Sequence, residues 1–336
     1  MPSPPLPMLR NSERTDFKRC PQRWWWSWRD GLYEAGPPAI ALWFGTGWHL
    51  VMAHHYGKPG LKRGANPLKV WRDWVGDEIP KIRVNLRGDQ EYKEEVYIDA
   101  LALGERMIGN YIDRWGKDST WHMIQVERPF EVVIMSEAGE RRVLFCGTYD
   151  GVYRDLKDDS IWLLEHKTAK AISLGHLTLD DQGGSYFLVA SRDLRHDKLI
   201  GPKENLRGIM YNFARKAPGD DRPRNAQGLA LNKDGQVSKQ QPSPLFVRHP
   251  VTRTMRERNS MVRRIQAEVE HMTAMKEGVL PIYKTPTKDC SWGCKFYEMC
   301  VMHESGGPDW EEYRDNIFKV CDPYQEHRKS AQAGDD

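Results

Sequence analysis

Long apolar runs, a nucleotide-binding loop and a strong net charge are all missing from this chain. No stretch of about 18 consecutive apolar residues occurs, so a membrane-spanning helix is not expected. No G-x-x-x-x-G-K-[ST] loop occurs either, which excludes a fused ATP-driven helicase. The net charge is only +3, from 50 basic and 47 acidic residues, so electrostatics alone does not single out a nucleic-acid-binding protein.

A secretion signal is also missing. Residues 1–8 are proline-rich and lack a basic segment followed by an apolar one, so we expect a cytoplasmic protein. Because that compartment is reducing, the six cysteines are expected to be metal ligands or core residues rather than disulfides. The chain has 336 residues, 39% of them hydrophobic, and can bury one large core or two modest ones.

The most informative stretch, Phe145–Lys170, predicts two strands joined by a tight turn. Its two ends are rich in aromatic and β-branched residues, and the segment between them is polar. Asp150 lies in the first predicted strand. Glu165 and Lys167 share one face of the second strand, because they are two residues apart. A hairpin symmetric about residues 157–158 places Asp150 opposite Glu165.

Two carboxylates that face each other across a hairpin repel and destabilise the sheet. A divalent cation between them removes the repulsion, and hard oxygen ligands suit Mg²⁺ or Mn²⁺. Lys167 would then stand beside the metal and stabilise a developing negative charge. The alternative is a bulge at Asp150 and a solvated pair of Glu165 and Lys167. The apolar run at residues 161–164 favours a functional acid, because it makes this strand a buried one.

Two segments of the hairpin, Gly147–Gly151 (GTYDG) and Leu164–Thr168 (LEHKT), resemble the active-site hairpin of the PD-(D/E)xK nucleases. The resemblance is greatest to the RecB-like iron–sulfur exonuclease branch, which includes the CRISPR-adaptation exonucleases and the AddB nuclease domain. It extends from about residue 12 to residue 301. It implies an α/β fold with a central mixed sheet flanked by helices, and an iron–sulfur cluster lobe joining the N- and C-terminal segments.

The resemblance assigns metal ligands. It implies that Mg²⁺ or Mn²⁺ is bound by the side chains of His49, Asp150 and Glu165 and by the backbone carbonyl of His166. His49 begins an apolar helix after a glycine-rich segment, and His54 and His55 are its competitors. Glu127 lies in a predicted strand that precedes a turn at Ser136–Glu140. The family often has an acid near that place, but a surface glutamate is the favoured interpretation.

A predicted helix at residues 176–192 contributes two further candidates. Gln182 and Tyr186 are four residues apart and therefore share a helical face. The resemblance places Gln182 beside the catalytic lysine, as a catalytic residue, and Tyr186 beside DNA. Gly183 and Gly184 depart from the family pattern, and each costs about 1 kcal/mol of helix propensity. We therefore expect that the helix starts late or that the motif is loosely built.

Three cysteines, Cys290, Cys294 and Cys300, lie in a short, irregular stretch. Such clusters bind metal in a reducing compartment, but the CxxC pairs of a usual zinc site are missing. A [4Fe–4S] cluster needs a fourth thiolate, for which Cys20 and Cys321 are available. The nearby Cys321 is simpler from the sequence alone, whereas the resemblance implies Cys20, which precedes a proline as in the family.

Two further groups of residues have two interpretations each. A predicted helix at 252–276 carries five arginines within 12 positions, which can form a solvated face or grip DNA phosphates. Its DNA-binding candidates are Arg256 and Arg263. Four tryptophans at positions 24–26 and 28 can stack on unpaired bases or pack the core, and the resemblance favours the core.

The predicted organisation is a single nuclease domain at residues 11–321, between a flexible N-terminus (1–10) and a polar tail (322–336). Its parts are a core at 121–216, a helical layer at 40–116, a flexible insertion at 217–244 and a cluster lobe made of 11–31 with 285–305.

These features together predict a metal-dependent DNA exonuclease, which acts on DNA ends or single strands in recombination, repair or replication. The intact Asp150, Glu165 and Lys167 favour this enzyme over a non-catalytic iron–sulfur DNA-binding module of the same fold. A structural zinc protein would leave the opposed carboxylates unexplained. The expected partner is DNA, with a recombination or single-strand-binding protein as a further candidate and no membrane.

Overall fold

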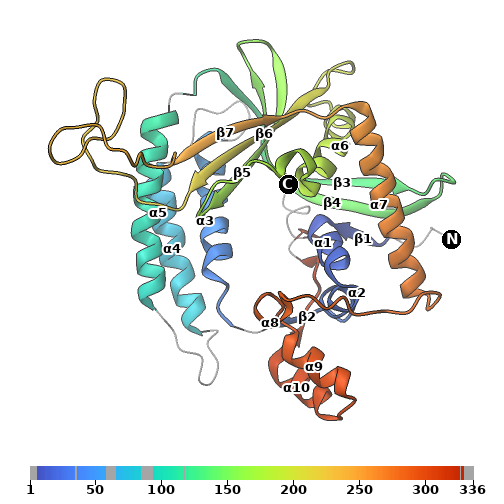
Figure 1. Ribbon diagram of the computed structural model, residues 1–336. Coiled ribbons are helices and arrows are strands. Elements are labelled where there is room, and N and C mark those ends of the chain that lie inside the picture. The colour runs from blue at the N-terminus through green and yellow to red at the C-terminus, as the bar shows by residue number, and fades with distance from the viewer. Residues whose placement is uncertain are drawn as a thin grey trace.

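The strand β4 (Arg141–Asp155) organises the central sheet (Figure 1). On one side, β3 (Trp121–Met135) pairs antiparallel with it along its whole length. On the other side, β1 (Met8–Arg10) pairs in parallel with its first half and β5 (Ser160–Ala169) pairs antiparallel with its C-terminal end. Between those two partners, residues 147–150 have no described strand beside them on that side.

The sheet continues from β5 to two more strands. β6 (Leu206–Arg215) runs parallel to β5, and β7 (Phe246–Val251) pairs antiparallel with β6. The order is β1-β4-β5-β6-β7, with β3 on the free side of β4. The predicted mixed central sheet flanked by helices is therefore confirmed.

Helices cover both faces of the sheet, because the side chains of β4 and β5 alternate between the faces. One face carries α3 (Ile40–Tyr56), α4 (Pro67–Val84) and α5 (Glu94–Trp115). Tyr153 and Leu164 pack against this layer, which is rich in tryptophan. Figure 1 shows these three helices side by side at the left of the sheet.

The opposite face carries α1 (Asn11–Arg19), α2 (Pro21–Trp24), the 3-10 turn η2 (Leu177–Leu179), α6 (Asp181–His196) and α7 (Met255–Lys276). Val152 and Leu163, one position away from the residues of the first face, pack here. Trp24 is fully buried in this core and Trp26 is buried in the next one, so the core interpretation of these tryptophans is confirmed.

A small lobe joins the two ends of the chain. It contains the π-helix η1 (Trp25–Arg29), β2 (Leu32–Glu34), α8 (Cys290–Gly293), α9 (Tyr297–Ser305), α10 (Asp309–Ile317) and β8 (Phe318–Val320). β2 and β8 pair antiparallel, which ties the N-terminal segment to the C-terminal one. Trp26, Phe296 and Phe318 form its core.

The structure, a computed structural model, describes residues 6–34, 36–57, 66–84, 94–116, 118–325 and 327–328. The predictions for residues 1–5 and for 329–336 lie outside these described residues. The prediction of a flexible N-terminus is wrong for β1, because Leu9 is 1% exposed in the core and its backbone pairs with β4. The described helices include none that is both long and apolar enough to cross a bilayer.

The C-terminal tail is also more ordered than a polar tail suggests. Tyr324 packs against Trp28 and donates a hydrogen bond to the carbonyl of Met8, and the side chain of His327 is buried near Glu131. These three contacts hold the described part of the tail on the N-terminal half of the domain.

The polar segment 217–244 contains no named helix or strand, as predicted, but it is not structureless. Two isolated β-bridges, Arg224 with Ala230 and Leu231 with Val237, fold it back on itself. Ala230 is fully buried, and the side-chain amide of Gln241 bonds to both its N–H and its carbonyl. Side chain-to-backbone bonds of this kind replace the apolar burial that the sequence lacks.

Candidate functional site

The two hairpin strands part just where the carboxylates lie. The register of β4 and β5 ends at Gly151 opposite Leu164, and its continuation puts Asp150 beside Glu165, as the hairpin symmetry predicts. Asp150 and Glu165 are 8% and 2% exposed. The separated strands leave room for a side chain from α3 to reach Asp150, and that side chain is His49.

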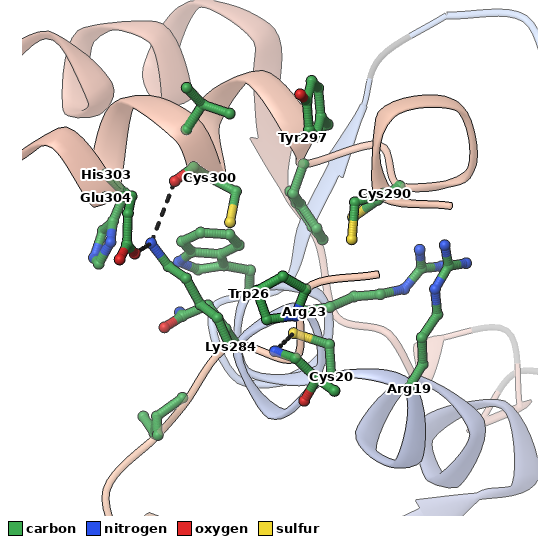
Figure 2. A pocket seen from close by; sticks show the side chains of 17 residues that line it. Arg19, Cys20, Arg23, Trp26, Lys284, Cys290, Tyr297, Cys300, His303 and Glu304 are labelled. Atoms are coloured by element: carbon green, nitrogen blue, oxygen red, sulfur yellow. Dashed lines mark hydrogen bonds and ion pairs between the residues drawn. The ribbon is translucent and has the colours of Figure 1, made fainter. Parts of the chain in front are cut away.

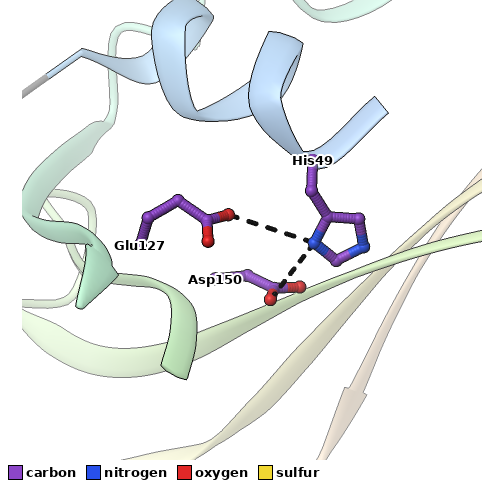
Figure 3. A group of neighbouring side chains, drawn as sticks. All are labelled: His49, Glu127 and Asp150. Carbon is purple, nitrogen blue, oxygen red and sulfur yellow. Dashed lines mark ion pairs between the residues drawn. The ribbon is translucent and has the colours of Figure 1, made fainter. Parts of the chain in front are cut away.

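His49, Glu127 and Asp150 come together from α3, β3 and β4 (Figure 3). His49 Nδ1 lies 3.3 Å from Asp150 Oδ1 and 4.0 Å from Glu127 Oε1. One ligand atom of each residue lies within 4.8 Å of those of the other two. Neighbouring ligands on an octahedral ion are about 3 Å apart when each is about 2.1 Å from the metal. The three side chains therefore fit a divalent cation with only a small inward shift.

Glu127 corrects the sequence interpretation, which favoured an ordinary surface glutamate. Its side chain is 38% exposed, but it points at His49. Its backbone has a φ of 44° within a strand, a conformation that costs a non-glycine residue on the order of 1–3 kcal/mol and persists mainly at functional sites. It lies between the pairs Val126–Gly151 and Arg128–Tyr149, opposite Asp150. A hairpin symmetric about the middle of the predicted turn at 136–140 would put Glu127 opposite Tyr149 instead, and the irregularity between Ile134 and Met135 shifts the register by one residue.

The carboxylates control the protonation of His49. Burial lowers the pKa of the His49 ring, but Asp150, Glu127 and Glu165 outweigh it and raise the pKa to about 9. Burial raises the pKa of Asp150, and His49 together with the backbone N–H of His166 more than offsets this and lowers it. Burial, assisted by Asp150, raises the pKa of Glu127 to about 7. The site therefore concentrates negative charge and attracts a cation.

Lys167 lies between Glu165 and Gln182. Its Nζ is 2.6 Å from Glu165 Oε1 and 3.1 Å from Gln182 Oε1. Burial lowers the pKa of Lys167, but Glu165 outweighs it and raises the pKa. Burial and the charge of Asp150 raise the pKa of Glu165 to about 7. The structure thus brings the predicted catalytic residues together and keeps the lysine charged.

Gly183 and Gly184 allow α6 to enter this site. The helix starts five residues later than the predicted residue 176, but before the glycines rather than after them. The helix begins at Asp181, before both glycines, and the side chain of Asp180 accepts a hydrogen bond from Gly183 N. A Cβ on Gly183 would lie 2.2 Å from the hydroxyl of Tyr211. A Cβ on Gly184 would lie 2.6 Å from Met261 Cε. The glycines therefore let the helix pack closely against β6 and α7.

The three predicted DNA contacts lie in different places. Tyr186 is 8% exposed and packs edge-on against Phe130, and burial together with the charges of Glu165 and Asp150 raises its pKa. Arg256 is exposed on α7, and Arg263 lies near Arg142 at the β3–β4 turn. Their contact with DNA stays a prediction.

The sequence interpretation missed a buried network behind His166. The His166 N–H donates to Asp150 Oδ2 at 2.7 Å, and the His166 ring Nδ1 lies 3.0 Å from Asn212 Nδ2. Asn212 donates to the hydroxyl of Tyr111, and Arg248 lies 3.9 Å over the nearby Trp121 ring. Burial lowers the pKa of His166 to about 3, so the ring is neutral. No local pattern signals these contacts, because their residues come from six different elements.

The cysteines of the C-terminal lobe line a cavity of about 710 Å³ together with Cys20. Figure 2 shows the sulfurs of Cys20, Cys290 and Cys300 pointing into it. Backbone amides of Thr285 and Thr287 donate to the sulfurs of Cys20 and Cys290, at 3.4 and 3.3 Å. Cys294 also lines the cavity, whereas Cys321 does not and its backbone N–H bonds to Gly31.

The spacing of the thiols bears on the group that they could bind. Within the described part of the chain, no three thiols lie within 4.8 Å of one another. Thiolates on a single zinc ion at about 2.3 Å lie only about 3.8 Å apart. Four separated thiols around one cavity suit a larger group, and a [4Fe–4S] cluster takes four thiolates. The binding of a cluster by these residues stays a prediction.

The sequence profile of the family described as PD-(D/E)XK nuclease superfamily matches residues 12–301. A search of curated proteins returns no match.

Proposed function

The chain belongs to the PD-(D/E)XK nuclease superfamily, and on that premise we propose that it is a Mg²⁺- or Mn²⁺-dependent DNA exonuclease. It hydrolyses phosphodiester bonds at DNA ends or in single strands, in recombination, repair or replication. The observation that carries this proposal is the approach of His49 Nδ1 to Asp150 and Glu127, beside the Lys167–Glu165 pair.

Each residue has a role in this proposal. His49, Asp150 and Glu127 bind the cation, with Glu165 and the backbone carbonyl of His166 as further ligands. A divalent cation at this place supplies a Lewis acid for the phosphate and lowers the pKa of a bound water. Lys167 places a positive charge where negative charge develops on the phosphate. Gln182 holds the Lys167 ammonium in that position through the 3.1 Å contact.

The proposal extends to the cysteine cavity. We assign Cys20, Cys290, Cys294 and Cys300 to a [4Fe–4S] cluster, which places the chain in the RecB-like iron–sulfur branch of the superfamily. The support is that these four cysteines line one cavity from both ends of the chain. The cluster would close the loop between the segments that β2 and β8 already pair.

The test is digestion of 5′- and 3′-end-labelled DNA, single- and double-stranded, with Mn²⁺, with Mg²⁺ and with a chelator. We expect stepwise shortening that requires the metal and is lost in Lys167→Ala, while that variant still binds DNA. DNA binding without metal-dependent cleavage by the wild type would instead favour the non-catalytic DNA-binding module. A Lys167→Ala protein that cleaves at the wild-type rate would exclude the assigned site.

A further inference from the structure

A second pocket lies at the start of α6, apart from the metal ligands and the cysteine cavity. Its volume is about 150 Å³. Leu179 and Gly184 line it from the α6 side, and α7 and Arg253, two positions before that helix, line the rest. The α7 side contributes Arg253, Glu257, Arg258, Ser260, Met261 and Arg264. Most of these are three or four residues apart and therefore form one face of the helix.

The positive charge of this pocket is incompletely neutralised. The Nε atoms of Arg253 and Arg258 are buried and have no hydrogen-bond partner in the described structure. The Arg258 guanidinium contacts the sulfur of Met255 and lies over the Phe187 ring. Arg264 contacts the sulfur of Met261 and reaches Asp181 only at 3.8 Å. The acid of the pocket, Glu257, is engaged in the capping box of α7.

Unsatisfied guanidinium donors in a small cavity suit a phosphate group. A buried donor without a partner costs about 1–3 kcal/mol, and a phosphate oxygen satisfies arginine donors with strong, charge-assisted hydrogen bonds. Leu179 and Met255, which are 75% and 60% exposed, add apolar surface beside the arginines. Phosphate next to apolar surface is the combination that a nucleic-acid strand presents.

The pocket and the catalytic lysine lie on two sides of the first turn of α6. Arg253 donates to the carbonyl of Asp180 at 3.1 Å, from the pocket side. The charge of Asp180 acts on Lys167, and Gln182, two residues later, contacts Lys167 directly. The pocket and the catalytic lysine are therefore separated by about one helix diameter, roughly 10 Å.

We propose that this pocket binds a backbone phosphate of the DNA strand being hydrolysed, a short distance along the strand from the scissile bond. This inference rests on the proposed nuclease function. It assigns strand binding to Arg258 and Arg264, on the face of α7 that meets α6. Arg256 and Arg263 are seven residues apart and therefore share another face of the same helix.

That helix provides matched controls for a binding experiment. In a Lys167→Ala background, the affinity for a fluorescein-labelled DNA strand is measured by anisotropy at several salt concentrations. We expect Arg258→Ala and Arg264→Ala each to weaken binding about tenfold and to reduce the salt slope by about 0.7, the value for one single-strand phosphate. Arg256→Ala and Arg263→Ala are the comparison for the other face of α7, and they should lose less affinity than Arg258→Ala and Arg264→Ala. Circular dichroism melts check that all four variants are folded.

A set of DNA strands, each with one neutral methylphosphonate, identifies the phosphate. At one position the neutral linkage should remove the difference in DNA affinity between Arg258→Ala and its parent. Equal losses of DNA affinity in all four arginine variants would overturn the pocket proposal. So would a set of strands in which no methylphosphonate position has this effect. Failure of the nuclease proposal is a separate result: the wild type would then not cleave, while the arginine variants would still lose DNA binding. If the wild type cleaves DNA but no methylphosphonate position removes the difference between Arg258→Ala and its parent, only the pocket proposal is overturned.

Discussion

His49 stands where the negative charge of the site is concentrated. A pKa of about 9 means that the ring carries a proton at neutral pH when no cation is bound. The Nδ1 atom that faces Asp150 and Glu127 is also the atom that would bind the metal, so metal binding must displace a proton from the ring. The imidazolium thus neutralises part of the carboxylate charge in the metal-free protein.

The identity of this ligand should determine metal preference. Imidazole is softer than carboxylate, which favours transition metals over Mg²⁺. We expect His49→Asp to lower the ratio of Mn²⁺-supported to Mg²⁺-supported cleavage severalfold, with the two rates measured at equal metal concentration. His54→Asp, an exposed position of the same helix, is the control and should leave the ratio unchanged. An unchanged ratio in His49→Asp would remove His49 from the metal ligands.

The sequence predicts the members of this site that depend on local geometry. Glu165 and Lys167 share a strand face because of a two-residue spacing, and hairpin symmetry places Asp150 beside Glu165. Glu127 was not available in this way, because symmetry about the turn at 136–140 pairs it with Tyr149 and the irregularity between Ile134 and Met135 shifts the register. Its positive φ has no sequence signal either. The contact of His166 with Asn212 depends on the packing of β5 against β6, which a local pattern does not contain.

At the scale of the element, the start of α6 positions Gln182. Gly→Ala in a helix ordinarily stabilises by about 0.5–1 kcal/mol. At Gly183 a Cβ would lie 2.2 Å from the Tyr211 hydroxyl, so Gly183→Ala must move α6 or β6. We expect Gly183→Ala to destabilise the protein by about 1–3 kcal/mol and to lower kcat, because Gln182 moves away from Lys167. Urea unfolding and single-turnover cleavage measure the two effects.

Gly109 in α5 is the matched control, because a Cβ there meets nothing within 4 Å. Gly109→Ala should be neutral or stabilising and should cleave at the parent rate. If both variants gain stability, the close approach at Gly183 is not a constraint.

The helix α1 is held by a buried acid. Glu13 is 1% exposed, accepts from Trp24 Nε1 at 2.9 Å and contacts the Tyr324 hydroxyl, which itself donates to the carbonyl of Met8. Burial raises the pKa of Glu13, although Tyr324 and Trp24 oppose the shift. A protonated Glu13 can donate to Tyr324, so that every polar group of this cluster is satisfied.

This protonation makes stability depend on pH. Since the folded pKa of Glu13 lies above the usual 4.5, its contribution is complete below pH 4.5 and is lost as pH rises through the folded pKa. Glu13→Gln mimics the protonated acid and has no such loss. We expect the free energy of unfolding of Glu13→Gln, relative to wild type, to increase above pH 4.5 by at most ~1.4 kcal/mol per pH unit. Urea titrations between pH 4 and 9 test this, and a difference that is constant with pH would contradict it.

Elements that form by local periodicity were predictable, and those that need a distant partner were not. The helix α7 follows from its apolar spacing and capping box, and β6 follows from its apolar run. β1 has three residues and forms only because β4 lies beside it. The organisation of the 217–244 segment depends in the same way on individual contacts such as that of Gln241 with Ala230.

At the scale of the whole molecule, the two chain ends fold as one unit. β2 pairs with β8, Tyr324 packs on Trp28, and Cys20 faces the C-terminal cysteines across one cavity. A cluster there would close a loop that encloses the whole active-site scaffold, and closing a long loop removes much freedom from the unfolded chain. The cluster should therefore stabilise both ends together.

The choice between Cys20 and Cys321 tests this arrangement. Cys20 lines the cavity, whereas Cys321 is exposed and pairs with Gly31 through its backbone. We expect Cys20→Ser to lose the brown colour and iron of the purified protein and to become sensitive to proteolysis at both ends. Cys321→Ser should stay brown, iron-loaded and active, because its thiol lies outside the cavity and its backbone bond to Gly31 is kept. Visible absorbance, iron content and limited proteolysis followed by mass spectrometry distinguish the two variants. Colour lost in Cys321→Ser and kept in Cys20→Ser would reverse the assignment of the fourth ligand, and a colourless wild type with one zinc per chain would remove the cluster altogether.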